Sequence, residues 1–232
     1  QQITPKTGSS FLIKMGFHKI WVDKDYNAGA LGGFTYGVTT EEMAGGYAAL
    51  ANDGVYRKAT CIRLIVNASN KTVVNETNRD SKVYDKSASR MMTQMLREVV
   101  LSGTGTSANV ENAVVAGKTG TTNASKDVWF CGYSKYYTTT VWAGYDYPKE
   151  MSGVNSRVNA IFKDFMTAVH TNLPVTDFST VTQQTTQPET TAAVQEETQS
   201  LPQETTAIVP EMETTGIEQV TPQQVPSTTA QV

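Results

Sequence analysis

The amino-acid composition changes sharply near residue 175, and this change limits how much of the chain can fold. The last basic residue is Lys163 and the last aromatic residue is Phe178. Residues 176–232 are rich in Thr, Gln, Glu and Pro, and contain eight acidic residues but no Lys or Arg. Such a segment buries too little apolar surface to offset the entropy lost on ordering. We therefore expect a folded portion at residues 1–175 and a disordered acidic tail at 176–232.

Four segments of the folded portion carry apolar residues at helical spacing. The second begins with a capping box, in which Thr39 and Glu42 can satisfy each other's backbone donors. The third carries Met91, Met92 and Met95, and we interpret this methionine stripe as part of the core. The expected helices are residues 9–16, 39–51, 86–102 and 156–171.

Segments typical of β-strands occupy the remaining apolar stretches of the folded portion. A hairpin is expected at residues 56–75, with its turn at 68–71. Later strands should be joined in part by a tight turn near Ser134. The order of helices, antiparallel strands and a packing helix predicts an α+β fold, an antiparallel sheet flanked by helices. The three later strands are expected at residues 113–121, 127–134 and 137–145.

Two glycine-containing motifs invite a nucleotide-binding interpretation, and both fail in context. A phosphate-binding loop needs a glycine five residues before Gly117, where this chain has Asn112, and it needs a helix after Thr119. The segment that follows is typical of a strand, so it lacks the helix dipole that attracts phosphate. The stretch GTGTSA at residues 103–108 follows an expected helix, whereas a dinucleotide fingerprint follows a strand.

The segment Lys118-Thr119-Gly120-Thr121 fits an acyl-transfer site better. Gly120 lacks a side chain, so a substrate backbone could approach and pair alongside the strand. The hydroxyls of Thr119 and Thr121 could bind a carboxylate, Lys118 adds positive potential, and the Thr121 N–H could face an oxyanion. A surface Lys-Thr-Gly turn is the alternative that these residues alone leave open.

The stretch VVAGKTGTTNASKDVWFCGYSKYYTTTVWAGYD resembles the Lys-Thr-Gly strand and following hairpin of penicillin-binding protein transpeptidase domains. Three further stretches, LGGFTYGVTTEEMAGGYAALANDGVY, LSGTGTSANVENAVVAGKTGTT and AIFKDFMTAVHTNLPVTDF, are similar to the class A, or bifunctional, group of that family. The stretches follow the family's order over residues 1–178. The resemblance implies an incomplete domain of the β-lactamase and transpeptidase type.

The resemblance also implies a chemistry, the cross-linking of peptidoglycan. In this family a serine of a Ser-x-x-Lys motif attacks the penultimate D-Ala carbonyl of a stem peptide, and an amine of a neighbouring strand resolves the acyl-enzyme. β-Lactams mimic the D-Ala-D-Ala end and acylate the same serine. Carried over to this chain, Lys118 and Thr121 would be catalytic, and Thr119, Gly120 and Thr121 would bind substrate.

The chain departs from the family pattern at the nucleophile. No serine in the sequence is followed three residues later by lysine. The single Ser-x-Asn, at residues 107–109, lies where the family places no catalytic motif, and we interpret it as coincidence. The chain is therefore expected to be a C-terminal fragment, inactive alone, with one apolar sheet face left exposed.

Two other functions share part of this pattern. A serine β-lactamase or a β-lactam sensor would keep the Lys-Thr-Gly strand, and rapid hydrolysis of penicillin would favour it. A non-catalytic module associated with the cell wall would explain the missing nucleophile and the long tail. Ser-x-x-Lys and Ser-x-Asn motifs encoded just upstream of Gln1 would reject that third interpretation.

The remaining residues predict no further chemistry. His18 and His170 are interpreted as surface or helix-face residues. Cys61 and Cys131 are too few for a metal site, and they are expected to be buried free thiols, with a disulfide as the alternative. No cofactor, metal or nucleic-acid partner is expected. No run of about 18 apolar residues occurs, so a membrane anchor would lie upstream, with the domain on the extracytoplasmic face of a bacterial membrane.

Overall fold

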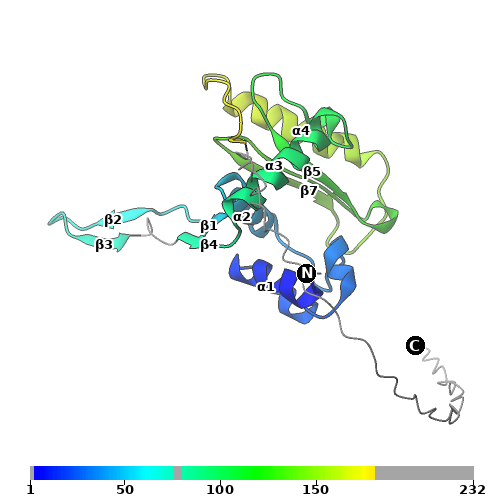
Figure 1. Ribbon diagram of the computed structural model, residues 1–232, viewed down its shortest axis with the longest axis horizontal. Helices are drawn as coiled ribbons and strands as arrows, with labels where there is room; N and C mark the ends of the chain where they lie inside the picture. The colour runs from blue at the N-terminus through cyan, green and yellow to red at the C-terminus, as the bar shows by residue number, and fades with distance from the viewer. Residues whose placement is uncertain (1–2, 76–79, 181–232) are drawn as a thin grey trace, which may run out of the picture. The chain divides into compact units, whose positions relative to one another are not determined.

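The computed structural model describes residues 3–75 and 80–180 (Figure 1). Most of the expected tail therefore lies outside the described residues, and its disorder stays a prediction. The described chain continues past residue 175 in contact with the folded portion. The hydroxyls of Thr176 and Tyr136 lie 2.8 Å apart, and the ring of Phe178 meets the ring of Tyr133 at 5.5 Å.

The first helix, α1, spans Pro5–Lys14 and begins four residues before the expected start. Thr4 caps it, because the Thr4 hydroxyl accepts a hydrogen bond from the Thr7 N–H at 3.2 Å. Proline is favoured at the first helical position, where its missing N–H costs nothing. The threonine and proline, rather than the later apolar residues, set the start of this helix.

The other three expected helices are confirmed within two residues at each end. Helix α2 spans Thr40–Ala51, α3 spans Lys86–Leu101 and α4 spans Val154–Val169. The predicted capping box is present at the start of α2. The Thr39 hydroxyl accepts from the Glu42 N–H at 3.1 Å, and a Glu42 carboxylate oxygen accepts from the Thr39 N–H at 2.8 Å.

The methionine stripe of α3 does not face the core, so that prediction is wrong. Met91, Met92 and Met95 are 54%, 39% and 56% exposed. The buried face contains two small polar residues that a hydrophobic pattern cannot reveal. One of them is Thr93, whose hydroxyl bonds the Ser89 carbonyl and the Tyr133 hydroxyl, both at 2.8 Å. The buried residues of α3 are Ser89, Thr93, Leu96 and Val100.

A three-stranded antiparallel sheet forms the centre of the structure, in the order β5-β6-β7. Its strands are β5 Ala116–Thr121, β6 Asp127–Tyr133 and β7 Thr138–Gly144, which confirms the three expected strands. The tight turn between β6 and β7 is closed by a hydrogen bond from the Ser134 N–H to the Tyr137 carbonyl at 2.8 Å. The predicted α+β fold, an antiparallel sheet flanked by helices, is confirmed.

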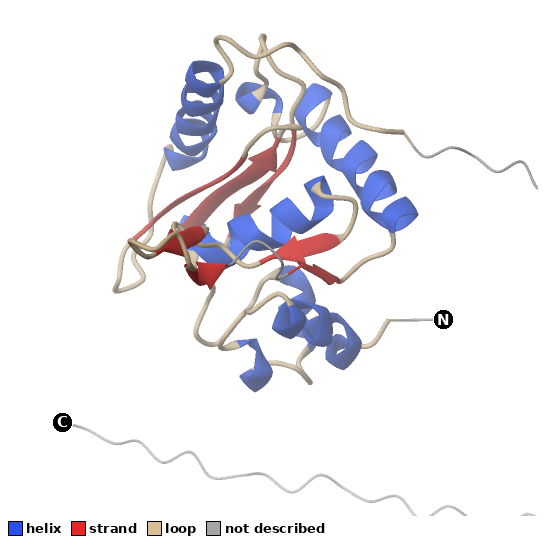
Figure 2. Ribbon diagram, turned by 90° about the vertical axis from the view of Figure 1, so that its left-hand side faces the viewer, coloured by secondary structure: helices blue, strands red, loops and turns tan. Residues whose placement is uncertain are grey.

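Helices cover the sheet on both sides (Figure 2). Phe162 of α4 packs on Phe130 of one face, with 4.5 Å between ring centroids. On the other face, Tyr133 contacts Tyr47 of α2 and Thr93 of α3. Phe130 and Tyr133 are both completely buried. We expected one apolar face of the sheet to be exposed. At the centre of the sheet it is not, because α2 and α3 cover the face opposite α4.

The expected hairpin is present, but its first strand is interrupted. β1 Val55–Arg57 pairs with β4 Asp80–Lys82, and β2 Leu64–Val66 pairs with β3 Thr72–Asn75. Residues 58–63 separate β1 from β2. The β2–β3 turn is held by the side-chain oxygen of Asn67, which accepts from the N–H groups of residues 69 and 71.

Candidate active site

The segment Lys118–Thr121 forms the second half of strand β5. The first half is buried, Lys118 and Thr121 are exposed, and Thr119 and Gly120 are partly buried. A three-residue 3-10 turn at Asn123–Ser125 follows, so no helix opens after Thr119. The structure therefore agrees with the rejection of a phosphate-binding loop.

Strand β5 lies at the edge of its sheet. Within the described residues it pairs with β6 alone, which leaves the backbone groups of its other edge available. Lys118 lies opposite Cys131 and Thr119 lies opposite Phe130. Because side chains alternate along a strand, Lys118 leaves β5 on the α2 and α3 side, and Thr119 and Thr121 leave on the α4 side. The Lys118 side chain can therefore reach the two threonine side chains only by passing around the open edge of β5.

Lys118 reaches around that edge to its neighbour. Its ammonium donates to the Thr119 carbonyl at 2.9 Å and lies 3.5 Å from the Thr119 hydroxyl. Over residues 3–75 and 80–180, no carboxylate lies within ion-pair distance of this ammonium. The exposed end of β5 therefore combines an uncompensated positive charge with a hydroxyl group, which suits a carboxylate.

Two residues that the sequence did not indicate hold the threonine hydroxyls. The Thr119 and Thr104 hydroxyls lie 2.8 Å apart, and the Thr121 hydroxyl donates to the Asn155 side-chain oxygen at 3.2 Å. Thr104 belongs to the GTGTSA stretch after α3, and Asn155 lies in the first turn of α4. The sequence carried a signal for the first, since GTGTSA lies in a stretch that resembles the family. It carried none for the second.

Gly103 and Gly105 allow the loop that contains Thr104 to pack closely against the C-terminal end of α3. The Gly105 N–H donates to the Val99 carbonyl at 2.9 Å. A Cβ on Gly103 would lie 2.9 Å from the Val99 Cα, and a Cβ on Gly105 would lie 3.2 Å from the Phe130 ring. These close approaches place Thr104 beside β5.

The Ser-x-Asn at residues 107–109 has structural contacts. The Ser107 hydroxyl accepts from the side-chain amide of Asn159 in α4 at 2.8 Å, and Ala108 is completely buried. Asn159 is itself 5% exposed. The triplet therefore joins the loop to α4.

His170 is buried at the residue that ends α4, so of the two places expected for it, the surface and a helix face, the surface is wrong. Its Nδ1 lies 2.6 Å from the Met166 carbonyl, and its Nε2 lies 2.8 Å from the Ser134 hydroxyl. A carbonyl only accepts, so Nδ1 carries a proton. His170 thereby ties the end of α4 to the β6–β7 turn. His18 is exposed, as expected, and its Nδ1 lies 3.1 Å from a Glu42 carboxylate oxygen.

The two cysteines are unpaired, so the disulfide alternative is wrong. Cys131 is buried as expected, and burial raises the pKa of its thiol to about 12. Cys61 is exposed, contrary to expectation, because it lies in the interrupted part of the hairpin. In the described part of the chain, no group of three or more His, Cys, Asp or Glu residues could hold a metal ion.

The model of one protein family, the penicillin binding protein transpeptidase domain, matches residues 8–167. This chain belongs to that family. The match includes the whole of β5 and both residues, Thr104 and Asn155, that hold its threonines.

Curated relatives carry the names of penicillin-binding proteins. Penicillin-binding protein 1A of Aquifex aeolicus is 38% identical over 180 residues, which cover 75% of this chain and 24% of the relative. Penicillin-binding protein 1A of Clostridium acetobutylicum is 33% identical over 172 residues, covering 74% of this chain and 21% of the relative. This chain thus spans about a quarter or less of the length of these relatives.

A solved structure has a similar fold. The penicillin-binding protein PonA1 from Mycobacterium tuberculosis superposes with a TM-score of 0.61 at 23% identity. The superposition covers 75% of this chain and 52% of that one.

Among the described residues of this transpeptidase-family chain, no helix is both long and apolar enough to cross a membrane.

Proposed function

We propose that this chain is part of a D,D-transpeptidase that cross-links peptidoglycan stem peptides through an acyl-serine intermediate. One observation carries the proposal: the exposed end of β5 gathers the Lys118 ammonium and the Thr119 hydroxyl at an open strand edge. PonA1, which shares the fold, has been solved in complex with penicillin V, at a TM-score of 0.60 and 20% identity. We extend β-lactam binding to this chain on that basis.

Each residue of the strand has a proposed role. The open edge of β5 pairs with the substrate backbone, and the missing side chain of Gly120 leaves room for it. Lys118 and Thr119 hold the terminal carboxylate of the donor peptide. The Thr121 N–H donates to the developing oxyanion, where a preorganised donor contributes most to the rate. Lys118 and Thr121 are thus the proposed catalytic residues.

The proposed nucleophile lies outside this chain. Because no serine here is followed three residues later by lysine, we propose that a preceding part of the polypeptide supplies the Ser-x-x-Lys and Ser-x-Asn motifs. The chain alone would then be inactive. The same preceding part would carry the membrane anchor and place the domain on the extracytoplasmic face.

The proposal is tested by replacing Lys118 with alanine in the full-length protein and measuring labelling by a fluorescent penicillin. Loss of the ammonium should slow acylation by about 30-fold or more, because removing one partner of a hydrogen-bonded charge pair costs about 2 kcal/mol or more. Lys135→Ala is the matched control, since Lys135 is exposed in the β6–β7 turn. Undiminished labelling of the Lys118→Ala protein would contradict the proposal. Rapid turnover of penicillin would instead indicate a β-lactamase.

A further inference from the structure

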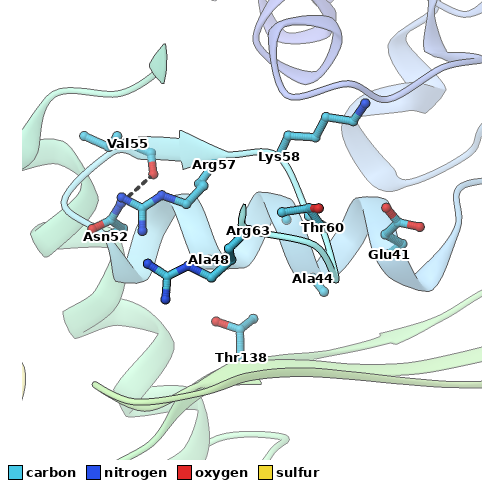
Figure 3. Close-up of a pocket in the computed structure, with 12 residues that line it drawn as sticks. Glu41, Ala44, Ala48, Asn52, Val55, Arg57, Lys58, Thr60, Arg63 and Thr138 are labelled. Atoms are coloured by element: carbon cyan, nitrogen blue, oxygen red, sulfur yellow. Dashed lines mark hydrogen bonds between the residues drawn. The ribbon is translucent and has the colours of Figure 1, made fainter. Parts of the chain in front are cut away.

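A cavity lies between α2 and the chain that leads from β1 into β2 (Figure 3). Its volume is about 660 Å³, which falls within the range of about 300–1,000 Å³ for small-ligand sites. None of Lys118–Thr121 lines it. The cavity is therefore distinct from the candidate active site.

Small residues of α2 form the floor of the cavity. Ala44, Gly45 and Ala48 line it, and Thr138 of β7 contributes a hydroxyl. A Cβ on Gly45 would lie 3.1 Å from the Tyr56 ring, so α2 and β1 approach each other closely at this point. Above Ala44 and Ala48 the short side chains leave a hollow that could hold small aliphatic groups.

Two arginines extend toward the end of the cavity near Asn52 (Figure 3). Arg57 is already held by Asp80, through two hydrogen bonds of 2.7 Å. Arg63 forms neither a hydrogen bond nor an ion pair with any of the described residues. This end of the cavity therefore has one uncompensated positive charge, which matches a single carboxylate better than a doubly charged phosphate.

The segment that carries Arg63 is held in place locally. The Thr60 hydroxyl donates to the Ile62 carbonyl at 2.9 Å and accepts from the Ile62 N–H at 3.1 Å. Arg63 then immediately precedes β2, whose Leu64 lies opposite Asn75 of β3. The backbone on both sides of Arg63 is thus hydrogen-bonded, which places the start of the Arg63 side chain beside the cavity.

The opposite end of the cavity is acidic. Glu41 lies there, roughly 10 Å along the helix axis from Ala48 at the ordinary rise of α2 (Figure 3). Glu41 has no hydrogen bond or ion pair within the part of the chain that the structure describes. The ammonium of Lys58 points away from the floor (Figure 3). A negative and a positive charge therefore face the cavity from its two ends.

We propose that this cavity binds a short peptide with free termini, about three residues long. The peptide carboxylate pairs with Arg63, its ammonium pairs with Glu41, and small side chains lie over Ala44 and Ala48. An extended chain spans about 3.3–3.6 Å per residue, so about three residues cover the roughly 10 Å that separates Glu41 from Ala48 along α2. The inference does not depend on the proposed transpeptidase function.

Isothermal titration calorimetry of the full-length protein with Ala-Ala-Ala tests the proposal. Saturable binding is expected, and Arg63→Gln should weaken it by about tenfold or more, because a charge-assisted pair is lost. Lys71→Gln is the matched control, since Lys71 is an exposed cation of the same hairpin that does not line the cavity. Penicillin labelling should be unchanged in both variants.

The probe peptide also separates the two charged ends. Amidation of its carboxylate should weaken binding to the unaltered protein and leave the residual affinity insensitive to Arg63→Gln. Acetylation of its amine should likewise weaken binding to the unaltered protein, and the residual affinity should be insensitive to Glu41→Gln. Absence of saturable binding, equal effects of Arg63→Gln and Lys71→Gln, or tighter binding of inorganic phosphate than of the peptide would each overturn the proposal. Normal penicillin labelling alongside any of these results would leave the proposed function intact.

Discussion

The two halves of strand β5 are held in place by different interactions. Ala116 and Gly117 are buried, and Gly117 lies so close to Phe130 that an added Cβ would come within 2.8 Å of the ring. Lys118 to Thr121 are partly or fully exposed, and the two threonine hydroxyls form hydrogen bonds with the side chains of Thr104 and Asn155. Packing thus fixes the strand, whereas side-chain hydrogen bonds orient its chemical groups. Stability and chemistry should respond to different substitutions a few residues apart.

Adding one methyl group to each half of β5 should produce the largest difference in the free energy of unfolding. Gly117→Ala forces the new Cβ against the Phe130 ring and the Cys131 carbonyl, at 2.8 and 2.9 Å. We expect it to lower the free energy of unfolding by about 1–3 kcal/mol, the usual cost of overpacking a core. Urea denaturation of the full-length protein measures this.

Gly120→Ala is the matched control for that experiment. Its new Cβ would lie 3.3 Å from the Trp129 Cβ, a contact that a small shift relieves. Its free energy of unfolding should therefore change by less than about 1 kcal/mol, whereas penicillin labelling should slow if a substrate backbone pairs there. Equal destabilisation by the two substitutions would contradict the division of β5 into two halves.

An intermediate effect is expected at Thr104, whose hydroxyl should affect the acylation rate and contribute little to stability. Thr104→Val removes the hydroxyl that lies 2.8 Å from Thr119 and keeps the shape of the side chain. Losing one hydrogen bond of about 1 kcal/mol should slow acylation by penicillin about fivefold. Stopped-flow labelling measures the rate, and the free energy of unfolding should fall by no more than about 1 kcal/mol.

Thr104→Ser restores the hydroxyl and should recover most of the acylation rate. If Thr104→Val and Thr104→Ser were equally slow, the methyl group of Thr104 would matter rather than its hydroxyl. Thr104 would then be a packing residue of the loop after α3.

The smallest effect concerns the thiol opposite Lys118. Burial raises the pKa of Cys131 from its ordinary value of 9.0 to about 12, because the folded protein disfavours the thiolate. The stability contributed by the neutral thiol is therefore complete below pH 9 and is lost as the pH rises toward 12. At pH 9.5 the loss should be at most about 1 kcal/mol.

Comparing Cys131→Ala with Cys61→Ala isolates this contribution. The difference in unfolding free energy between pH 8 and pH 9.5 should shrink in the Cys131 variant. It should be unchanged in the Cys61 variant, because Cys61 is exposed. If Cys61→Ala reduced the pH dependence as much as Cys131→Ala does, the burial assigned to the two thiols would be wrong.

Local patterns determined most of the secondary structure. The capping box of Thr39 and Glu42 set the start of α2, and apolar periodicity located α3, α4 and all three strands of the sheet. The same local reasoning placed Lys118 to Thr121 on a strand and excluded a phosphate loop. These features depend on residues within a few positions of one another, so the sequence displays them directly.

The tertiary structure alone decided which face of each helix is buried. Thr93 is buried in α3 because Tyr133, forty residues later, offers its hydroxyl, whereas Met91 and Met95 are more than half exposed. His170 is buried because Ser134 lies beside the end of α4. Thr104 becomes part of the candidate site only through the fold, since Thr119 is fifteen residues away. Pairings between distant residues have no period in the sequence, and for that reason no local pattern could predict them.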